Sequence, residues 1–153
     1  MNTESDRPNL GWVPASGHQL RMAGVHFDAV RVDGETGRDL ADLMERLTGG
    51  RTGPVITEAN GRRSTYFLVP PGSTGHRPWP REAERLTGGP GRVSYVLVPA
   101  LYGWTWPLSW RCVPPPDGQL VHALLLRNAL AALLATAERA APEAVRPARP
   151  FGS

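Results

Sequence analysis

The acidic, hydroxyl and thiol side chains that could carry chemistry are few and widely spaced. Asp28 and Asp33 lie five residues apart, so in a strand they face opposite sides and cannot clamp one metal ion together. The tripeptides S-G-H at 16–18 and T-G-H at 74–76 bring a hydroxyl near an imidazole only in sequence. Cys112 is the only cysteine, which excludes an internal disulfide. These residue types predict no catalytic apparatus.

Arginine is the residue type that points most clearly to a ligand. All 17 basic residues are arginines, and without lysine no phosphate loop of the G-x-x-x-x-G-K type is present. Residues 51–92 hold seven arginines against three acids, so a phosphate-binding surface is expected there. The alternative is a solvated polar rim around a sheet. Because the arginine excess also fits a GC-rich, actinobacterial type of coding sequence, the net charge of +3 does not by itself indicate nucleic-acid binding.

Three tryptophans follow one another closely at Trp104, Trp106 and Trp110. Indole faces stack on any nucleobase, so this segment could bind an unpaired strand. The alternative is a packing role, either in the core or as a lid over a sheet edge.

The first half of the chain predicts a strand, a helix and a hairpin that would position these groups. Residues 25–32 have the apolar pattern of a strand, and 36–48 place leucine and methionine at helical spacing before a Gly-Gly cap at 49–50. Residues 55–58 and 64–69 are strand-like and flank an A-N-G turn, which predicts a β-hairpin.

The next segment predicts a short helix at 80–87 and a strand at 92–98. The hexapeptide E-R-L-T-G-G occurs at both 45–50 and 84–89, and we interpret it in both places as the end of a helix. It reflects either a duplicated helix–strand unit or convergence on an ordinary helix stop.

The last predicted element is a long helix over 119–140, with Asp117 as its N-cap and an end before Pro142. Its apolar residues occupy opposite sides of the helix. The helix is therefore either sandwiched between the sheet and the 36–48 helix or covered by a second copy of the chain.

These elements predict an α+β fold in one domain over residues 12–141. We expect an antiparallel or mixed sheet of about four to five strands, packed by two main helices. The flanking residues, 1–11 and the Pro/Arg-rich 142–153, are expected to be disordered. No apolar run reaches the length of a membrane span, and the polar start does not have the pattern of a signal peptide. A cytoplasmic protein without membrane contact is the expectation.

Three segments in order carry a family resemblance. Residues 30–34 read V-R-V-D-G, 61–72 read G-R-R-S-T-Y-F-L-V-P-P-G, and 91–100 are followed by G-W-T-W at 103–106. The order and spacing resemble the N-terminal domain of bifunctional primase–polymerases (Prim-Pol), in the archaeo-eukaryotic primase superfamily. The resemblance covers about half of the chain and implies a reduced primase-like core related to the RRM fold.

The departures from that family imply loss of catalysis. The family's first metal-binding aspartate falls on Arg31, which leaves Asp33 alone, and its nucleotide-contacting histidine falls on Ser64. No acid precedes Val93 to serve as a third carboxylate. Two-metal phosphoryl transfer needs several carboxylates, so the resemblance implies a degenerate, non-catalytic scaffold with no metal ion and no cofactor.

We therefore predict a nucleic-acid-associated accessory or regulatory factor. In that hypothesis arginines contact the phosphates, and an aromatic side chain stacks on a base. Arg31 and Ser64 take the positions of the family's metal-binding aspartate and nucleotide-contacting histidine. The candidate residues are Arg31, Asp33, Arg62, Arg63, Ser64, Tyr66, Arg92 and Trp104. The alternative is a protein–protein module, a homodimer or adaptor, that docks through the 119–140 helix or the 104–116 segment. Residual enzymology with Asp33 alone is a third reading.

Overall fold

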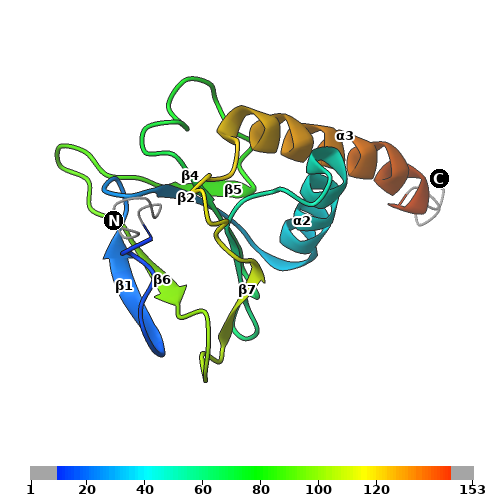
Figure 1. The fold of residues 1–153 in the computed structure, drawn as a ribbon. Helices are drawn as coiled ribbons and strands as arrows, with labels where there is room; N and C mark the ends of the chain where they lie inside the picture. The colour runs from blue at the N-terminus through cyan, green and yellow to red at the C-terminus, as the bar shows by residue number, and fades with distance from the viewer. Residues whose placement is uncertain (1–9, 146–153) are drawn as a thin grey trace.

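The computed structural model describes residues 10–145, with side chains from 10 to 139, and is built around a five-stranded antiparallel sheet of order β5-β2-β4-β3-β7 (Figure 1). A separate antiparallel ribbon pairs β1 with β6. The bounds are β1 His18–Met22, β2 Asp28–Val32, β3 Val55–Glu58, β4 Thr65–Val69, β5 Ala83–Leu86, β6 Tyr95–Pro99 and β7 Leu108–Cys112. The predicted α+β fold is confirmed, with five strands in the main sheet. The ribbon is a second sheet, and it contains the strand predicted at 92–98 as β6.

Two helices and the ribbon cover opposite faces of the sheet. The helices are α2 (Gly34–Thr48) and α3 (Ala123–Val145), and Figure 1 shows both on one side of the sheet and the ribbon on the other. Val30 and Phe67 pack toward the helices, whereas their neighbours Ala29 and Leu68 pack toward the ribbon. This period of two is what a strand buried on both faces requires. Within residues 10–145, no helix is both long and apolar enough to span a membrane.

Helix α2 begins directly after β2 and ends as the sequence predicts. Leu40 and Met44 are fully buried against the sheet. Gly37 allows the helix to approach β2, because a Cβ there would lie 2.3 Å from the carbonyl oxygen of Val32. The helix ends at Gly49 in the left-handed conformation (φ 64°), which confirms the predicted cap.

Helix α3 begins later than predicted. Asp117 accepts a backbone N–H two residues further along in a turn, and His122 Nδ1 accepts the N–H of Leu125 at the true start of the helix. Leu120 and Val121 therefore precede the helix and pack into the two core clusters. The apolar residues of the 119–140 segment therefore do not all have to be buried by a single helix.

The apolar face of α3 packs inside the molecule. Leu126 and Leu130 are fully buried, which favours the sandwiched arrangement over a face left for a second copy. The helix continues to Val145, so the predicted end before Pro142 is wrong. Pro142 lies in the last turn, where its missing N–H removes one intrahelical hydrogen bond. The disorder predicted for residues 1–9 and 146–153 lies outside the described residues.

The predicted short helix at 80–87 is wrong. This segment makes a turn, with the N–H of Ala83 donating to the oxygen of Pro80, and then forms strand β5 against β2. Without β5, one edge of the buried strand β2 would be unpaired, so long-range pairing overrides the local helical pattern. Strands β1 and β7 were not among the predicted elements. The strand predicted at 25–32 is β2, which begins at Asp28 rather than at residue 25.

Candidate nucleic-acid interface

Asp33 and Ser64 meet at the junction between β2 and α2. Asp33 is the N-cap position of α2, but its side chain makes no bond to the helix. Instead Ser64 Oγ, in a residue 2% exposed, donates a short 2.6 Å hydrogen bond to Asp33 Oδ1. A short bond from a hydroxyl to a carboxylate is charge-assisted, so Asp33 is held in one orientation.

Arg31 lies between two carboxylates. Its Nε is 3.3 Å from Asp33 Oδ1, and its Nη2 is 2.6 Å from Oε1 of Glu84 on β5. The strand register pairs Arg31 with Glu84 directly, so this contact is built into the sheet. Because two negative charges face one positive charge, Arg31 is not a free phosphate ligand.

Tyr66 stands opposite Arg31 in the β2–β4 register. Burial raises the pKa of its phenol, the nearby Glu58 carboxylate raises it further, and Arg31 partly opposes both effects. The side chain is half-buried and stays protonated near neutral pH. It therefore serves as a neutral hydrogen-bonding group beside Arg31 and Ser64.

Arg62 and Arg63 occupy the turn between β3 and β4. Arg63 has a positive φ of 54°, and its N–H donates to the oxygen of Asn60. The carbonyl groups of Arg62 and Arg63 accept the N–H of Gly34, so the turn is tied to the start of α2. The Arg62 side chain is 72% exposed, and its Nη1 lies 3.6 Å from Asp33 Oδ2. This long, exposed contact leaves the guanidinium accessible to solvent and ligands.

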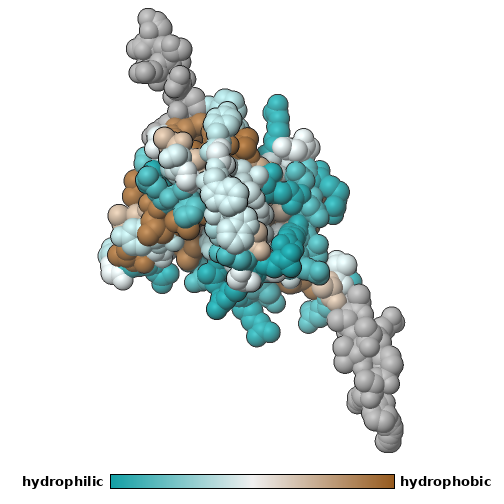
Figure 2. Space-filling model, turned by 90° about the horizontal axis from the view of Figure 1, so that it is seen from below, coloured by the Kyte–Doolittle hydropathy of each residue, from teal (hydrophilic) through white to brown (hydrophobic). Residues whose placement is uncertain are grey.

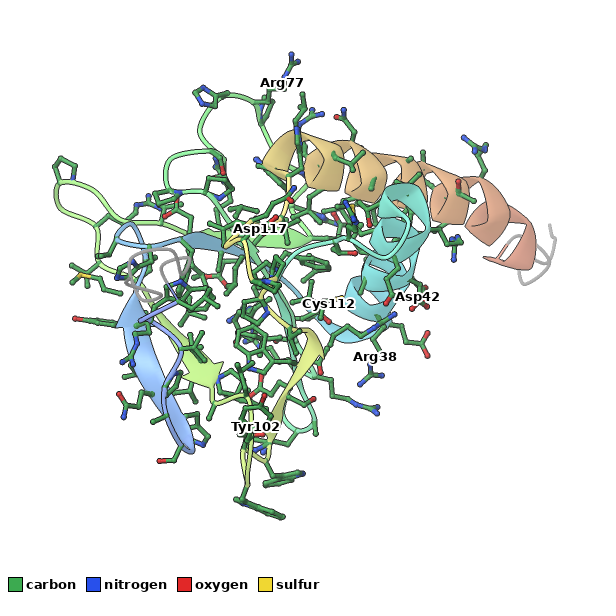
Figure 3. The ribbon with its side chains drawn as sticks, viewed as in Figure 1. Arg38, Asp42, Arg77, Tyr102, Cys112 and Asp117 are labelled. Carbon is green, nitrogen blue, oxygen red and sulfur yellow. The ribbon has the colours of Figure 1, made fainter. Side chains whose placement is uncertain are left out.

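An aromatic loop between β6 and β7 carries Tyr102, Trp104 and Trp106, which are 83%, 80% and 56% exposed. Figure 3 shows Tyr102 at the far end of this loop, away from both helices. Trp110, by contrast, is partly buried and its Nε1 donates to the oxygen of Pro99. The two interpretations of the tryptophan segment therefore apply to different residues: Trp110 packs, and the loop residues do not.

The aromatic loop lies beside the arginine turn. The N–H of Ala59, at the start of the turn, donates to the oxygen of Pro107 at the end of the loop over 2.8 Å. Figure 2 looks toward this end of the molecule, where strongly hydrophilic side chains border pale ones of intermediate hydropathy, the class that includes tryptophan and tyrosine. The Ala59–Pro107 hydrogen bond thus brings the arginine turn and the aromatic loop to one end of the molecule.

Arg92 is not part of this group. It lies in the connection from β5 to β6 and borders two hollows together with Asp28, the first residue of β2, whereas Asp33 follows the last residue of that strand. Of the eight predicted residues, the structure brings together Arg31, Asp33, Arg62, Arg63, Ser64 and Tyr66, with Trp104 on the neighbouring loop.

The sequence reasoning missed Glu84 and Glu58 as members of the site. Glu84 was placed in the predicted helix at 80–87, and only the pairing of β5 with β2 carries it to Arg31. Among the described residues, no three His, Cys, Asp or Glu side chains cluster in a way that could hold a metal ion. The groups that this arrangement offers to a ligand are arginines, a phenol and exposed rings.

Comparisons of the chain with protein-family models, with curated proteins and with solved structures find no match. The resemblance to primase–polymerase domains stays a prediction.

Proposed function

We propose that the protein binds single-stranded nucleic acid in the cytoplasm as a non-catalytic accessory factor. The observation that carries this proposal is the contact between the arginine turn at 59–64 and the aromatic loop at 101–106. Proteins that bind unpaired strands without reading sequence combine a basic track for the backbone with aromatic side chains for the bases.

The phosphate contacts are assigned to Arg62 and Arg63. Both are exposed, and the ion pair that Arg62 makes with Asp33 is long. Arg31 is assigned a positioning role, because its charge is already offset by Asp33 and Glu84. Arg92 borders the hollow at Asp28, so it is not assigned a phosphate contact in this interface.

The base contacts are assigned to Trp104 and its neighbours on the loop. Single exposed aromatic side chains are common on protein surfaces. Three large exposed rings within five residues form a patch, and such patches mark interaction sites. Stacking of a base on such a ring contributes about 1–3 kcal/mol.

The proposal assigns binding rather than phosphoryl transfer because of Arg31. Two-metal transfer requires unpaired carboxylates that face a shared cation. Here Asp33 and Glu84 both pair with the guanidinium of Arg31. The fixed positive charge takes the place of a cation between them.

A homodimer or adaptor through α3 has less support. The face of α3 that would form such an interface is used by Leu126 and Leu130 inside the molecule, and Leu124, at 42% exposed, is its most exposed leucine among the described side chains.

The proposal is tested by fluorescence anisotropy with a labelled deoxythymidine oligonucleotide of about 20 residues, longer than a typical binding site for a single strand. We expect binding at low salt that weakens as salt rises. Trp104→Ala should weaken it about tenfold, and Arg62→Ala with Arg63→Ala should also flatten the salt dependence.

The matched control is Arg77→Ala, because Figure 3 shows Arg77 and Tyr102 at opposite ends of the molecule. This variant makes the same change in charge as Arg62→Ala alone and should bind like the parent protein. No anisotropy change at low salt, or equal losses for Arg77→Ala and Arg62→Ala, would overturn the proposal.

A further inference from the structure

The carboxylate of Asp28 is buried with one oxygen unused. The residue is 1% exposed and opens strand β2. Its Oδ2 accepts the N–H of Gly72 over 2.8 Å, whereas its Oδ1 has no hydrogen-bond partner. A buried acceptor without a donor is destabilising, so an unpaired carboxylate oxygen at this position calls for an explanation.

Two hollows meet at Asp28. Their volumes are about 420 and 300 Å³, and both are lined by Asp28, Gly72, Gly88 and Arg92. The shared wall is glycine for a steric reason, since a Cβ at Gly88 would lie 2.6 Å from the carbonyl oxygen of Ala23. We call these two hollows the double cavity, and each lobe reaches the size of small-ligand sites.

The two lobes have different linings. The larger lobe adds the apolar side chains of Met22, Val25, Pro71 and Val93. The smaller lobe adds Arg85 and the hydroxyl residues Thr74 and Thr87. An occupant that fills both lobes would therefore have one apolar, flat end and one polar end, with a hydrogen-bond donor between them.

Two arginines at the double cavity lack an acidic partner. Arg85 Nη1 donates to the oxygen of Thr74 over 3.1 Å, and no ion pair of Arg85 or Arg92 occurs among the described side chains. Guanidinium groups without a carboxylate bind phosphate well, because their planar N–H donors match its oxygens.

We propose that the double cavity binds a nucleoside monophosphate whose base carries an amino group. The base lies in the apolar lobe, its amino group donates to Asp28 Oδ1, and Arg85 and Arg92 hold the phosphate. A free amino acid fits less well, because its ammonium and carboxylate groups share one carbon and cannot reach both lobes. This site is independent of the proposed nucleic-acid interface, which lies at the other end of β2.

Titration calorimetry with AMP, CMP and GMP tests the inference, and UMP and inorganic phosphate serve as the comparison ligands. We expect the amino-bearing nucleotides to bind at least tenfold more tightly than UMP or phosphate. Equal binding of phosphate alone would reduce the site to a general anion site, and equal binding of UMP would contradict the role of Asp28. No heat at millimolar nucleotide would also overturn the proposal.

Three variants test the assigned residues. Asp28→Asn keeps an acceptor for the N–H of Gly72 but places a donor at the ligand side, so AMP binding should fall at least tenfold. Arg92→Ala changes an exposed side chain and tests the phosphate contact even if the Asp28 variant folds poorly. Arg81→Ala is the control, because Arg81 is exposed and borders neither lobe.

Oligonucleotide binding separates the two proposals. Asp28→Asn should leave the affinity for deoxythymidine oligonucleotide unchanged, and Trp104→Ala should leave AMP binding unchanged. If Asp28→Asn weakened oligonucleotide binding as well, the double cavity would be a subsite for the end of a strand, and the assignment to a free mononucleotide would be wrong.

Discussion

Arg31 links three strands and a helix junction through its guanidinium. It reaches Asp33 after β2 and Glu84 on β5, and it faces Tyr66 on β4. Ser64 then adds a donor to the same Asp33 oxygen that Arg31 contacts. The sequence identified Arg31, Asp33, Ser64 and Tyr66 as candidates, and their proximity follows from the register of the β2–β4 strand pair.

Ser64→Ala tests how much the buried hydroxyl contributes. The change removes the donor of the 2.6 Å bond and leaves Asp33 Oδ1 with Arg31 alone. Because Asp33 is partly exposed and water replaces part of the bond, we expect the free energy of unfolding to fall by about 1–2 kcal/mol. Urea denaturation measures this, and Ser16→Ala, in an exposed residue, is the control. Equal stabilities of the two variants would contradict the role of Ser64.

Asp28 should make the stability of the fold depend on pH. Burial raises the pKa of its carboxyl group. The hydrogen bond from the N–H of Gly72 only partly opposes this effect, as does the nearby N–H of Gly24, which donates to the oxygen of Phe27. The folded state therefore holds the proton more tightly than the unfolded chain. The stability that results is present below the unfolded pKa and is lost as pH rises through the folded pKa.

Asp28→Asn removes that titration. As pH rises from about 4, the parent protein should lose stability relative to the variant, because only the parent must bury a charge. Melting temperatures by circular dichroism across this range give the comparison, with Arg85 and Arg92 as the nearest charged side chains that line the same space. Parallel curves for parent and variant would show that the carboxyl group is not desolvated.

At the scale of elements, one hexapeptide adopts two structures. E-R-L-T-G-G ends α2 at residues 45–50, whereas the same letters at 84–89 begin within strand β5. The difference is in the partners: the second copy pairs with β2 and its Glu84 bonds to Arg31. Local propensity predicted the first copy correctly and the second wrongly, because the deciding contacts are distant in sequence.

The same reasoning explains which parts of the site the sequence could predict. Helix α2 and the β3–β4 hairpin have strong local signals, and the family resemblance grouped the residues at their ends as one candidate site. Strands β5 and β7 lie at the edges of the sheet and are defined by pairing rather than by pattern. Glu84 on β5 was therefore missed, and the aromatic loop could not be placed beside the arginine turn before the β3–β7 pairing was known.

Gly88→Ala tests the approach between the end of β5 and the turn that joins β1 to β2. A Cβ there would lie 2.6 Å from the oxygen of Ala23, so backbone must shift, and we expect a loss of about 1–3 kcal/mol in thermal or urea unfolding. Gly75→Ala is the matched control, because its nearest neighbour would be the oxygen of Gly72 at 3.8 Å. Equal loss of stability in both variants would show that the backbone at Ala23 and Gly88 shifts without cost.

At the scale of the molecule, the sheet separates two apolar layers and presents two charged ends. The helix side and the ribbon side each have their own buried cluster, and β2, β3 and β4 contribute to both. The arginine turn and aromatic loop lie at one end of β2, and the double cavity lies at the other. Binding at either end can therefore be removed by substitution without opening the core.

Strand β2 also fixes the distance between these two ends. It is hydrogen-bonded to β4 on one edge and to β5 on the other, so its length cannot change without breaking the sheet. Its first and last residues are about 13 Å apart. Simultaneous occupancy by two separate small molecules is therefore sterically allowed, and competition between the ends would reveal a ligand long enough to touch both.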